Sequence, residues 1–267
     1  MSKGAKEIVL LLLHYSPDFT RPTAVQLQKA ITYALREGHA HILLPLLDTR
    51  ISLNFQFLDC RATSAYTPLL WAIEEGDIQL LNLLLEGDNA DPNYCTGDED
   101  QIPLLKAALK NHERMARILV SRTSRLHRTR ALALSMDHGD GQIAQVLLEN
   151  GTLPDFKDGD HTASIEEFDC NLGRVHDPLI PPIIRAVCRG HTNLVKLLVT
   201  YGANVDVEYR GWIKELSEWI IGGPLLLTIQ LGDQETTDFQ RGQGAREGVS
   251  KGLCAQFENW SYNRPSD

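Results

Sequence analysis

The stretch that decides the fold runs from Pro181 to Asp206 and reads PPIIRAVCRGHTNLVKLLVTYGANVD. A second stretch, from Thr67 to Asn93, reads TPLLWAIEEGDIQLLNLLLEGDNADPN. Both place a proline before an apolar pair, a small residue four positions after that proline, and a glycine four positions further on. Apolar residues then follow at spacings of one, four and five. A fixed pattern that recurs in one chain indicates an internal structural repeat.

The pattern has a physical explanation as a pair of helices. Thr67 can cap a helix, and Pro68 occupies the first helical position, where its missing N–H does no harm. Gly76 suits the left-handed conformation that ends a helix. The apolar residues of the second segment form one helical face, at Leu80, Leu81, Leu84 and Leu85. A single pair of helices cannot bury that face, but stacked neighbours can.

The repeated pattern resembles the ankyrin repeat, T-P-L-H-x-A-A-x-x-G-H-x-x-x-V-x-x-L-L-x-x-G-A-D-x-N. The later stretch matches it at Pro182, Ala186, Gly190, His191, Val195, Leu198, Gly202 and Ala203. The earlier stretch matches it at Thr67, Pro68, Leu69, Ala72, Gly76, Leu84 and Leu85. The resemblance implies an all-α solenoid of stacked helix-turn-helix units. The alternative is an irregular helical bundle, which would not need the proline and the glycine at fixed offsets.

This register divides the chain into one repeat array over residues 1–235 and a flexible tail over 236–267. The expected copies lie at about 25–54, 62–93, 97–122, 127–155 and 178–206, between half copies at 6–20 and 220–235. The tail is rich in Gly, Gln and Ser and shows no apolar period.

Two spacings between copies exceed the ankyrin period of about 33 residues. The 51 residues from Arg130 to Pro181 place a long insertion at 155–178, and the 42 residues from Pro181 to Gly223 place a smaller one at about 209–221. Insertions in such arrays lie on the loop face, which is often the binding face.

The overall charge and the cysteines limit the partners and the compartment. Lys and Arg number 26 against 35 Asp and Glu, a net charge of −9, which argues against nucleic acid as a partner. The five cysteines are dispersed without a C-x-x-C pair, which is typical of reduced thiols in the cytoplasm or nucleus. The apolar run from Ile8 to Leu13 is too short for a signal-peptide core or a membrane span. We therefore expect a cytoplasmic or nuclear monomer that contacts neither nucleic acid nor membrane.

The ankyrin resemblance implies that the first helices line a concave surface with outward side chains at fixed positions. Carried over onto this chain, those positions are Trp71, Glu74, Glu75, Lys106, Leu109, Lys110, Leu134, Asp137, His138, Arg185, Cys188 and Arg189. The charged residues and Trp71 among them are the candidate partner contacts, joined by Tyr209 and Trp212 in the smaller insertion. Trp71 is the expected anchor, because Trp and Arg dominate interface energies. The alternative for each Trp is packing within its own loop.

Two charged segments have both a functional and a structural interpretation. The long insertion contains six acidic residues from Asp155 to Asp169, but Lys157 and Asp160 break the calcium-loop pattern, so a flexible acidic loop is expected. The basic stretch from Arg114 to Arg130 could dock an acidic peptide or a phosphate group. The favoured interpretation is a solvated helix end and loop, balanced by neighbouring acidic loops.

No catalytic motif is present, and a Cys188–His138 pair is disfavoured because the two positions are offset in adjacent copies about 10 Å apart. The sequence therefore predicts a non-catalytic protein–protein interaction module without cofactor or metal. One alternative is an enzyme that uses the groove and the 155–178 insertion as a pocket. Another is a truncated ankyrin-containing product without independent activity, suggested by the two half copies.

Overall fold

The computed structural model describes residues 24–38, 52–58, 65–86, 89–94, 101–139, 141–156, 180–213 and 218–246. The chain divides into two compact units, one ending at Ser124 and the other beginning at Arg125. Both units are built from the predicted helix pairs, so the all-α prediction is confirmed. The expected half copy at 6–20, the insertion beyond residue 156 and the tail beyond residue 246 lie outside the described residues.

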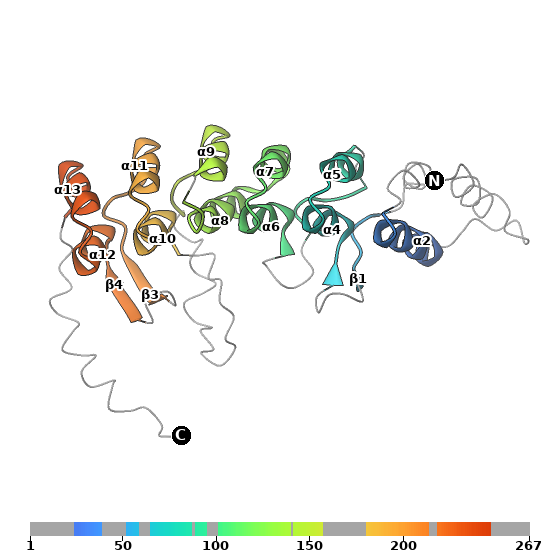
Figure 1. Ribbon diagram of the computed structural model, residues 1–267, viewed down its shortest axis with the longest axis horizontal. Coiled ribbons are helices and arrows are strands. Elements are labelled where there is room, and N and C mark those ends of the chain that lie inside the picture. The colour runs from blue at the N-terminus through green and yellow to red at the C-terminus, as the bar shows by residue number, and fades with distance from the viewer. Residues whose placement is uncertain are drawn as a thin grey trace, which may run out of the picture. The chain divides into compact units, whose positions relative to one another are not determined.

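In the first unit, a short first helix is followed after a turn by a second helix, and helices of the same kind pack together. Figure 1 shows α4 beside α6 and α5 beside α7, and α2 packs on α4. A short antiparallel ladder of β1 (Phe57–Leu58) and β2 (Ala65–Tyr66) precedes α4. The helices are α2 (Ala24–Arg36), α4 (Pro68–Glu74), α5 (Ile78–Leu85), α6 (Pro103–Leu109), α7 (Glu113–Leu119) and the short 3-10 helix η3 (Val120–Arg122).

The α4–α5 pair forms as its sequence predicts. The Thr67 hydroxyl accepts a hydrogen bond from the Leu70 N–H at 3.2 Å, and Pro68 occupies the first turn of α4. Gly76 ends the first helix with φ +69°, and Asp77 then caps α5 by accepting from the Leu80 N–H at 2.9 Å. The four leucines predicted to form the apolar face of α5 are all buried. Ala72 is fully buried, so it leaves room for the close approach of neighbouring helices.

The second unit repeats the arrangement, with α8 and α10 packed together and α10 against α12. Figure 1 shows α8, α10 and α12 as the first helices and α9, α11 and α13 as the second helices of three successive pairs. The longer α8 begins without a proline, which agrees with the degenerate turn of that copy. The helices are α8 (Arg125–Ser135), α9 (Gln142–Glu149), α10 (Pro182–Cys188), α11 (Thr192–Thr200), α12 (Pro224–Leu231) and α13 (Gln234–Gly242).

The smaller insertion forms a β-hairpin between α11 and α12. Strand β3 (Tyr209–Ile213) pairs antiparallel with β4 (Glu218–Gly222), and Trp212 lies opposite Trp219 in the register. The repeat spacing located this insertion, but an insertion length by itself carries no information on secondary structure.

The expected end of the array is wrong. We predicted a half copy at 220–235 and a flexible tail from residue 236, but α13 continues to Gly242 and completes a helix pair with α12. The apolar pattern fails here because the inner face of α13 is polar, with Thr236, Thr237 and Gln240 buried. Hydrogen bonds replace apolar contacts: the Thr228 hydroxyl donates to the Leu225 carbonyl at 2.8 Å and lies 3.2 Å from Gln240 Oε1.

The first prediction concerns Asn111, which occupies the turn position after α6 with φ +55°. Asn tolerates the left-handed region better than other residues with a Cβ. We expect Asn111→Ala to lower the free energy of unfolding by about 1 kcal/mol, as measured by urea denaturation. Asn111→Gly is the matched control, because it removes the same side chain but accepts the positive φ. An equal loss in both variants would show that side-chain contacts, and not the backbone, make Asn111 important.

The second prediction concerns the pH dependence of α13. Burial alone would raise the pKa of Asp233, but hydrogen bonds from the Thr236 hydroxyl and backbone N–H outweigh it and hold that pKa below its ordinary value. A lowered carboxyl pKa stabilises the fold above the unfolded-state pKa, and this contribution is lost as the pH falls through the folded-state pKa.

Amide exchange of α13 measures this contribution. We expect α13 in the wild type to be better protected than in Asp233→Asn near neutral pH, with the difference shrinking below about pH 4. A difference that stays constant down to acidic pH would contradict an ionised Asp233 cap.

Candidate protein-binding surface

The candidate contacts occupy repeating positions relative to the residue that ends each first helix. They lie five, two and one residues before that turn residue, and we call them the first-helix row of each unit. In the first unit the row comprises Tyr33, Arg36, Glu37, Trp71, Glu74, Glu75, Lys106, Leu109 and Lys110. In the second unit it comprises Leu134, Asp137, His138, Arg185, Cys188, Arg189, Leu227, Gln230 and Leu231.

Trp71 is not an exposed anchor, and that expectation is corrected. Its side chain is only 3% exposed. The ring of Phe57 lies 5.7 Å from the indole, and the ring of Tyr66 meets it edge-on at 5.6 Å. Both aromatic residues come from the β1–β2 ladder before α4, so Trp71 packs within its own loop, as the alternative interpretation held. The repeat register gives the position of a residue on its helix, but it does not reveal which loop side chains cover that residue.

The charged residues of the first unit form one ion-paired cluster across neighbouring copies. Glu74, at the end of α4, lies 3.1 Å from the Lys106 ammonium and 2.6 Å from that of Lys110, both on or just after α6. Burial alone would raise the pKa of Glu74, but the hydrogen bonds from Lys110 and Lys106 outweigh it and lower that pKa. Glu75, the adjacent row residue, is exposed.

The second unit contains the same arrangement built from arginines. Asp137, just after α8, receives Arg185 Nε at 3.3 Å and Arg189 Nε at 3.0 Å on one oxygen, Oδ1. In both units, therefore, a carboxylate of one copy is held by two cations that lie four residues apart on the next first helix. Cations are favourable near the C-terminal end of a helix, where the peptide carbonyls point outward. The structure thus brings together residues of neighbouring copies that the sequence predicted as separate partner contacts.

Arg185 is also corrected as a partner contact, since it is 3% exposed. Its position corresponds to that of Trp71 in the earlier copy, and both side chains lie inward. Arg189 is exposed, whereas His138 and Cys188 are half-buried. In this copy the position directly before the turn residue is therefore more accessible than the position five residues before it.

The two aromatic candidates of the smaller insertion lie on β3. Tyr209 is half-buried, and its backbone pairs with Gly222. The Trp212 side chain lies outside what the structure describes, so its role as a contact stays a prediction.

Counting from the turn residue also identifies row residues that were not among the candidates predicted from the sequence. Tyr33 in α2 is 65% exposed, and it stands at the slot equivalent to that of Trp71. Leu231, at the end of α12, is 41% exposed. The sequence contained the information needed to find these two residues, because Gly38 and Gly232 mark the same turn in the less regular copies.

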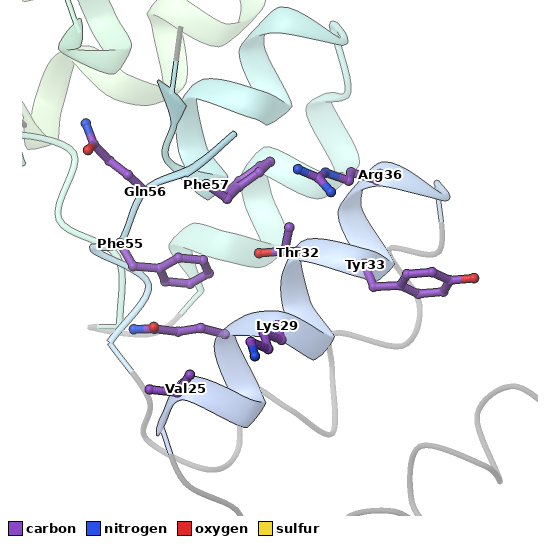
Figure 2. A pocket seen from close by; sticks show the side chains of 9 residues that line it. Val25, Lys29, Thr32, Tyr33, Arg36, Phe55, Gln56 and Phe57 are labelled. Carbon is purple, nitrogen blue, oxygen red and sulfur yellow. The ribbon is translucent and has the colours of Figure 1, made fainter. Parts of the chain in front are cut away.

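A cavity of about 450 Å³ lies beside α2 in the first unit. Figure 2 shows that Phe55, Phe57 and Thr32 face it, with Lys29 and Arg36 on α2, while Tyr33 points away from the two phenylalanines. A second cavity of about 380 Å³ borders Trp71 and is lined by Arg36, Glu37, Glu75 and Asp77 among others. Charged linings such as this one differ from the apolar pocket with a few polar groups that is typical of small-molecule sites.

The basic stretch is largely used within the fold. Arg117 pairs with Glu113 at 2.8 Å, and Arg122 donates to the Leu85 carbonyl at 2.6 Å in the first unit. In the second unit Arg128 donates to the Asn150 carbonyl at 3.2 Å, and Arg130 is buried. The stretch is thus bound within the fold, largely through backbone carbonyls, and is not the solvated segment balanced by acidic loops that the sequence favoured.

The described part of the acidic insertion is also structural. Asp155 Oδ2 accepts a hydrogen bond from the Asn204 N–H at 2.8 Å. Burial raises the pKa of Asp155 despite this hydrogen bond. The remaining acidic residues, from Asp158 to Asp169, lie outside the described residues.

The described residues contain no group of three or more His, Cys, Asp or Glu placed to hold a metal ion. No described helix combines the length and the apolar character needed to cross a membrane.

Comparison with known families identifies the class of protein. Ankyrin repeats (3 copies) match residues 1–96 and 69–158, and a single Ankyrin repeat matches residues 181–209. Because these matches span more than half of the sequence, the chain belongs to the ankyrin repeat family. Ankyrin repeats are generally protein–protein interaction modules and are typically non-catalytic.

Two solved ankyrin repeat domains are similar to this chain. An ankyrin repeat domain from Acinetobacter baumannii AYE matches with a TM-score of 0.57 and 17% identity over 82% of this chain and 100% of that chain. The human ASB11 ankyrin repeat domain matches with a TM-score of 0.47 and 22% identity over 67% of this chain and 70% of that chain. No curated protein matches this chain. The first likeness confirms the predicted ankyrin-type solenoid.

The third prediction concerns the Asp137 cluster. Asp137→Ala leaves the buried Arg185 guanidinium without its carboxylate, so we expect the free energy of unfolding to fall by about 3 kcal/mol in urea denaturation. Glu235→Ala is the control, because Glu235 pairs with Lys196 at 2.8 Å on the exposed surface. That control should lose less than about 1 kcal/mol. Similar losses in both variants would mean that the buried cluster is no more important to stability than a surface pair.

Proposed function

We propose that this chain is a non-catalytic interaction module that binds a protein partner through its first-helix rows. The observation that carries the proposal is the exposure of the row position directly before the turn residue. Glu37, Glu75, Lys110, Arg189 and Leu231 occupy this position in five of the six described copies and are exposed, whereas His138 in the remaining copy is half-buried. Their backbone positions repeat, but their side chains differ in chemistry. This combination suits a repeated scaffold that presents a different contact residue in each copy.

The exposed aromatic ring of Tyr33 adds to this support. A Tyr side chain offers large contact area and one polar group at low entropic cost, which makes it a frequent interface anchor. Tyr33 thus takes the anchoring role that the sequence assigned to Trp71. Within the same proposal the chain acts as a monomer in the cytoplasm or nucleus, without nucleic acid or membrane as partner.

The enzyme alternative receives no comparable support. The groove beside Trp71 has a charged lining, and Trp71 itself is covered by its neighbouring aromatic rings. The proposed module therefore needs neither a cofactor nor a metal.

The fourth prediction tests the proposed surface by capture from lysate with quantitative mass spectrometry. A Tyr33→Ala, Glu75→Lys variant should lose most of the specifically captured partner, because both changes alter exposed row residues. Lys196→Gln, which changes a cation on the second helix α11, should retain it. Trp71→Ala and Arg185→Ala are unsuitable for this test, because both remove buried side chains and so lower stability.

Thermal unfolding of each variant shows whether the fold is retained. If folded row variants and the control capture the same proteins in equal amounts, the first-helix row of the first unit is not the binding surface.

A further inference from the structure

We infer that the cavity beside α2 in the first unit binds an extended acidic segment of the protein partner. The segment pairs its main chain with that of Phe55 and Gln56 and places a carboxylate at Lys29. This inference rests on the proposed function, and it names the kind of chain that one part of the surface recognises.

Residues 52–58 form an extended stretch that is longer than β1 itself. Leu53, Phe55 and Phe57 are buried, whereas Gln56 and Leu58 are exposed. Inward and outward side chains thus follow one another with the period of a β-strand. The extended stretch therefore begins before the two residues of β1 that pair with β2.

The first support is that this strand extends beyond its partner. Continuing the β1–β2 register places Gln56 opposite Thr67, but Thr67 caps α4, and the partner chain leaves the ladder there. No hydrogen bond joins the main chain of Phe55 or Gln56 to another residue that the structure describes. Unpaired N–H and C=O groups along a strand are a template for a further strand, and several domains bind extended peptides in this way.

The unpaired stretch borders the cavity of about 450 Å³. Residues 55–57 line it on one side and α2 lines it on the other, and Figure 2 shows the Phe55 ring directed toward α2. Val25, in the first turn of α2, also lines the cavity and is 59% exposed. An extended chain in the cavity thus meets unpaired main-chain groups together with apolar side chains.

The second support is the charge of the lining. The described residues that line the cavity include two cations, Lys29 and Arg36, and no carboxylate. Arg36 already interacts with another group of the protein, so the contact is assigned to Lys29, which is exposed. An ammonium group beside an apolar cavity is complementary to a carboxylate. This support is independent of the first, because it concerns side chains and not the main chain.

The same observations favour a polypeptide over a nucleic acid. Consecutive peptide units of an extended chain present N–H and C=O groups at the spacing of the unpaired strand, and nucleotides do not. A nucleic acid would in addition meet the repulsion of a chain with net charge −9.

Selection of random dodecapeptides displayed on phage, with the full chain as bait, tests this inference. We expect peptides that combine Asp or Glu with apolar residues for the wild type and for Arg114→Gln. The acidic preference should disappear for Lys29→Gln. Arg114→Gln is the matched control, because it removes an exposed cation from α7, a second helix of the same unit. Thermal unfolding should be nearly unchanged in both variants, since both residues are exposed.

Synthetic copies of the selected peptides then provide an affinity. Lys29→Gln should weaken their binding about tenfold in fluorescence anisotropy, and replacing the peptide's acidic residue by its amide should have a similar effect. The two changes together should cost little more than either alone, because both remove the same contact. Acidic preference that survives Lys29→Gln, or is absent from the wild-type selection, overturns the inference.

A scan of the peptide by single N-methylation tests the main-chain pairing. Alternate residues of a strand direct their N–H groups to the same edge, so we expect binding to be lost at every second position. The absence of any such alternation overturns the pairing with residues 55–56. Binding of a single-stranded oligonucleotide that competes with the peptides and depends on Lys29 overturns the choice of a polypeptide.

The outcomes separate this inference from the proposed function. If the Tyr33→Ala, Glu75→Lys variant loses its captured partner but no peptide depends on Lys29, the interaction module stands and the extended acidic segment does not. If peptides depend on Lys29 but lysate capture is unaffected by changes in the row of the first unit, the reverse holds.

Discussion

The fold depends on one constraint: a helix pair in this chain cannot bury its own apolar face and must stack on the next pair. In α5 the leucines at positions 80, 81, 84 and 85 are all buried, and α5 packs against α7. The first helices can approach closely because a fully buried alanine, such as Ala72 or Ala186, lies at their contact. Every other feature follows from this stacking. The turn residues repeat because each pair must reverse at the same place, and the row positions repeat because the helices are aligned.

The sequence predicted the repeated elements well, because caps, turns and apolar spacing are local properties. Thr67, Pro68 and Gly76 took the roles expected of them. The predictions failed where the outcome depends on neighbours in space. Trp71 is covered by aromatic rings from the β1–β2 ladder, which the repeat spacing does not predict. Arg185 is buried by the copies around it. The helix α13 was missed because its inner face consists of Thr and Gln, whose hydrogen bonds with α12 cannot be recognised from an apolar period. The ankyrin register placed the row residues on neighbouring copies, but their ion pairs and the burial that distinguishes Arg185 from Arg189 required the structure.

The two ion-paired clusters join neighbouring copies of the stacked fold. A carboxylate fixed by two cations of the next copy ties the copies to each other, as Glu74 does with Lys106 and Lys110. The same arrangement leaves one positive charge in excess at each cluster. Around Asp137 that charge resides on arginines, whose planar groups favour bidentate contact with a carboxylate. The first helices of the second unit thus contain more arginines than carboxylates, but Arg130 and Arg185 are buried and Arg128 bonds to a backbone carbonyl.

The polar interior between α12 and α13 affects how the protein responds to denaturants and to heat. The denaturant sensitivity and the heat capacity of unfolding both grow with the apolar surface that becomes exposed. The buried side chains of α13 itself are Thr236, Thr237 and Gln240, so this helix contributes little apolar surface of its own when it detaches. Such an opening would change the m value and the calorimetric baseline only slightly. Bulk unfolding curves would then describe the leucine-rich copies and overlook the helix that follows them.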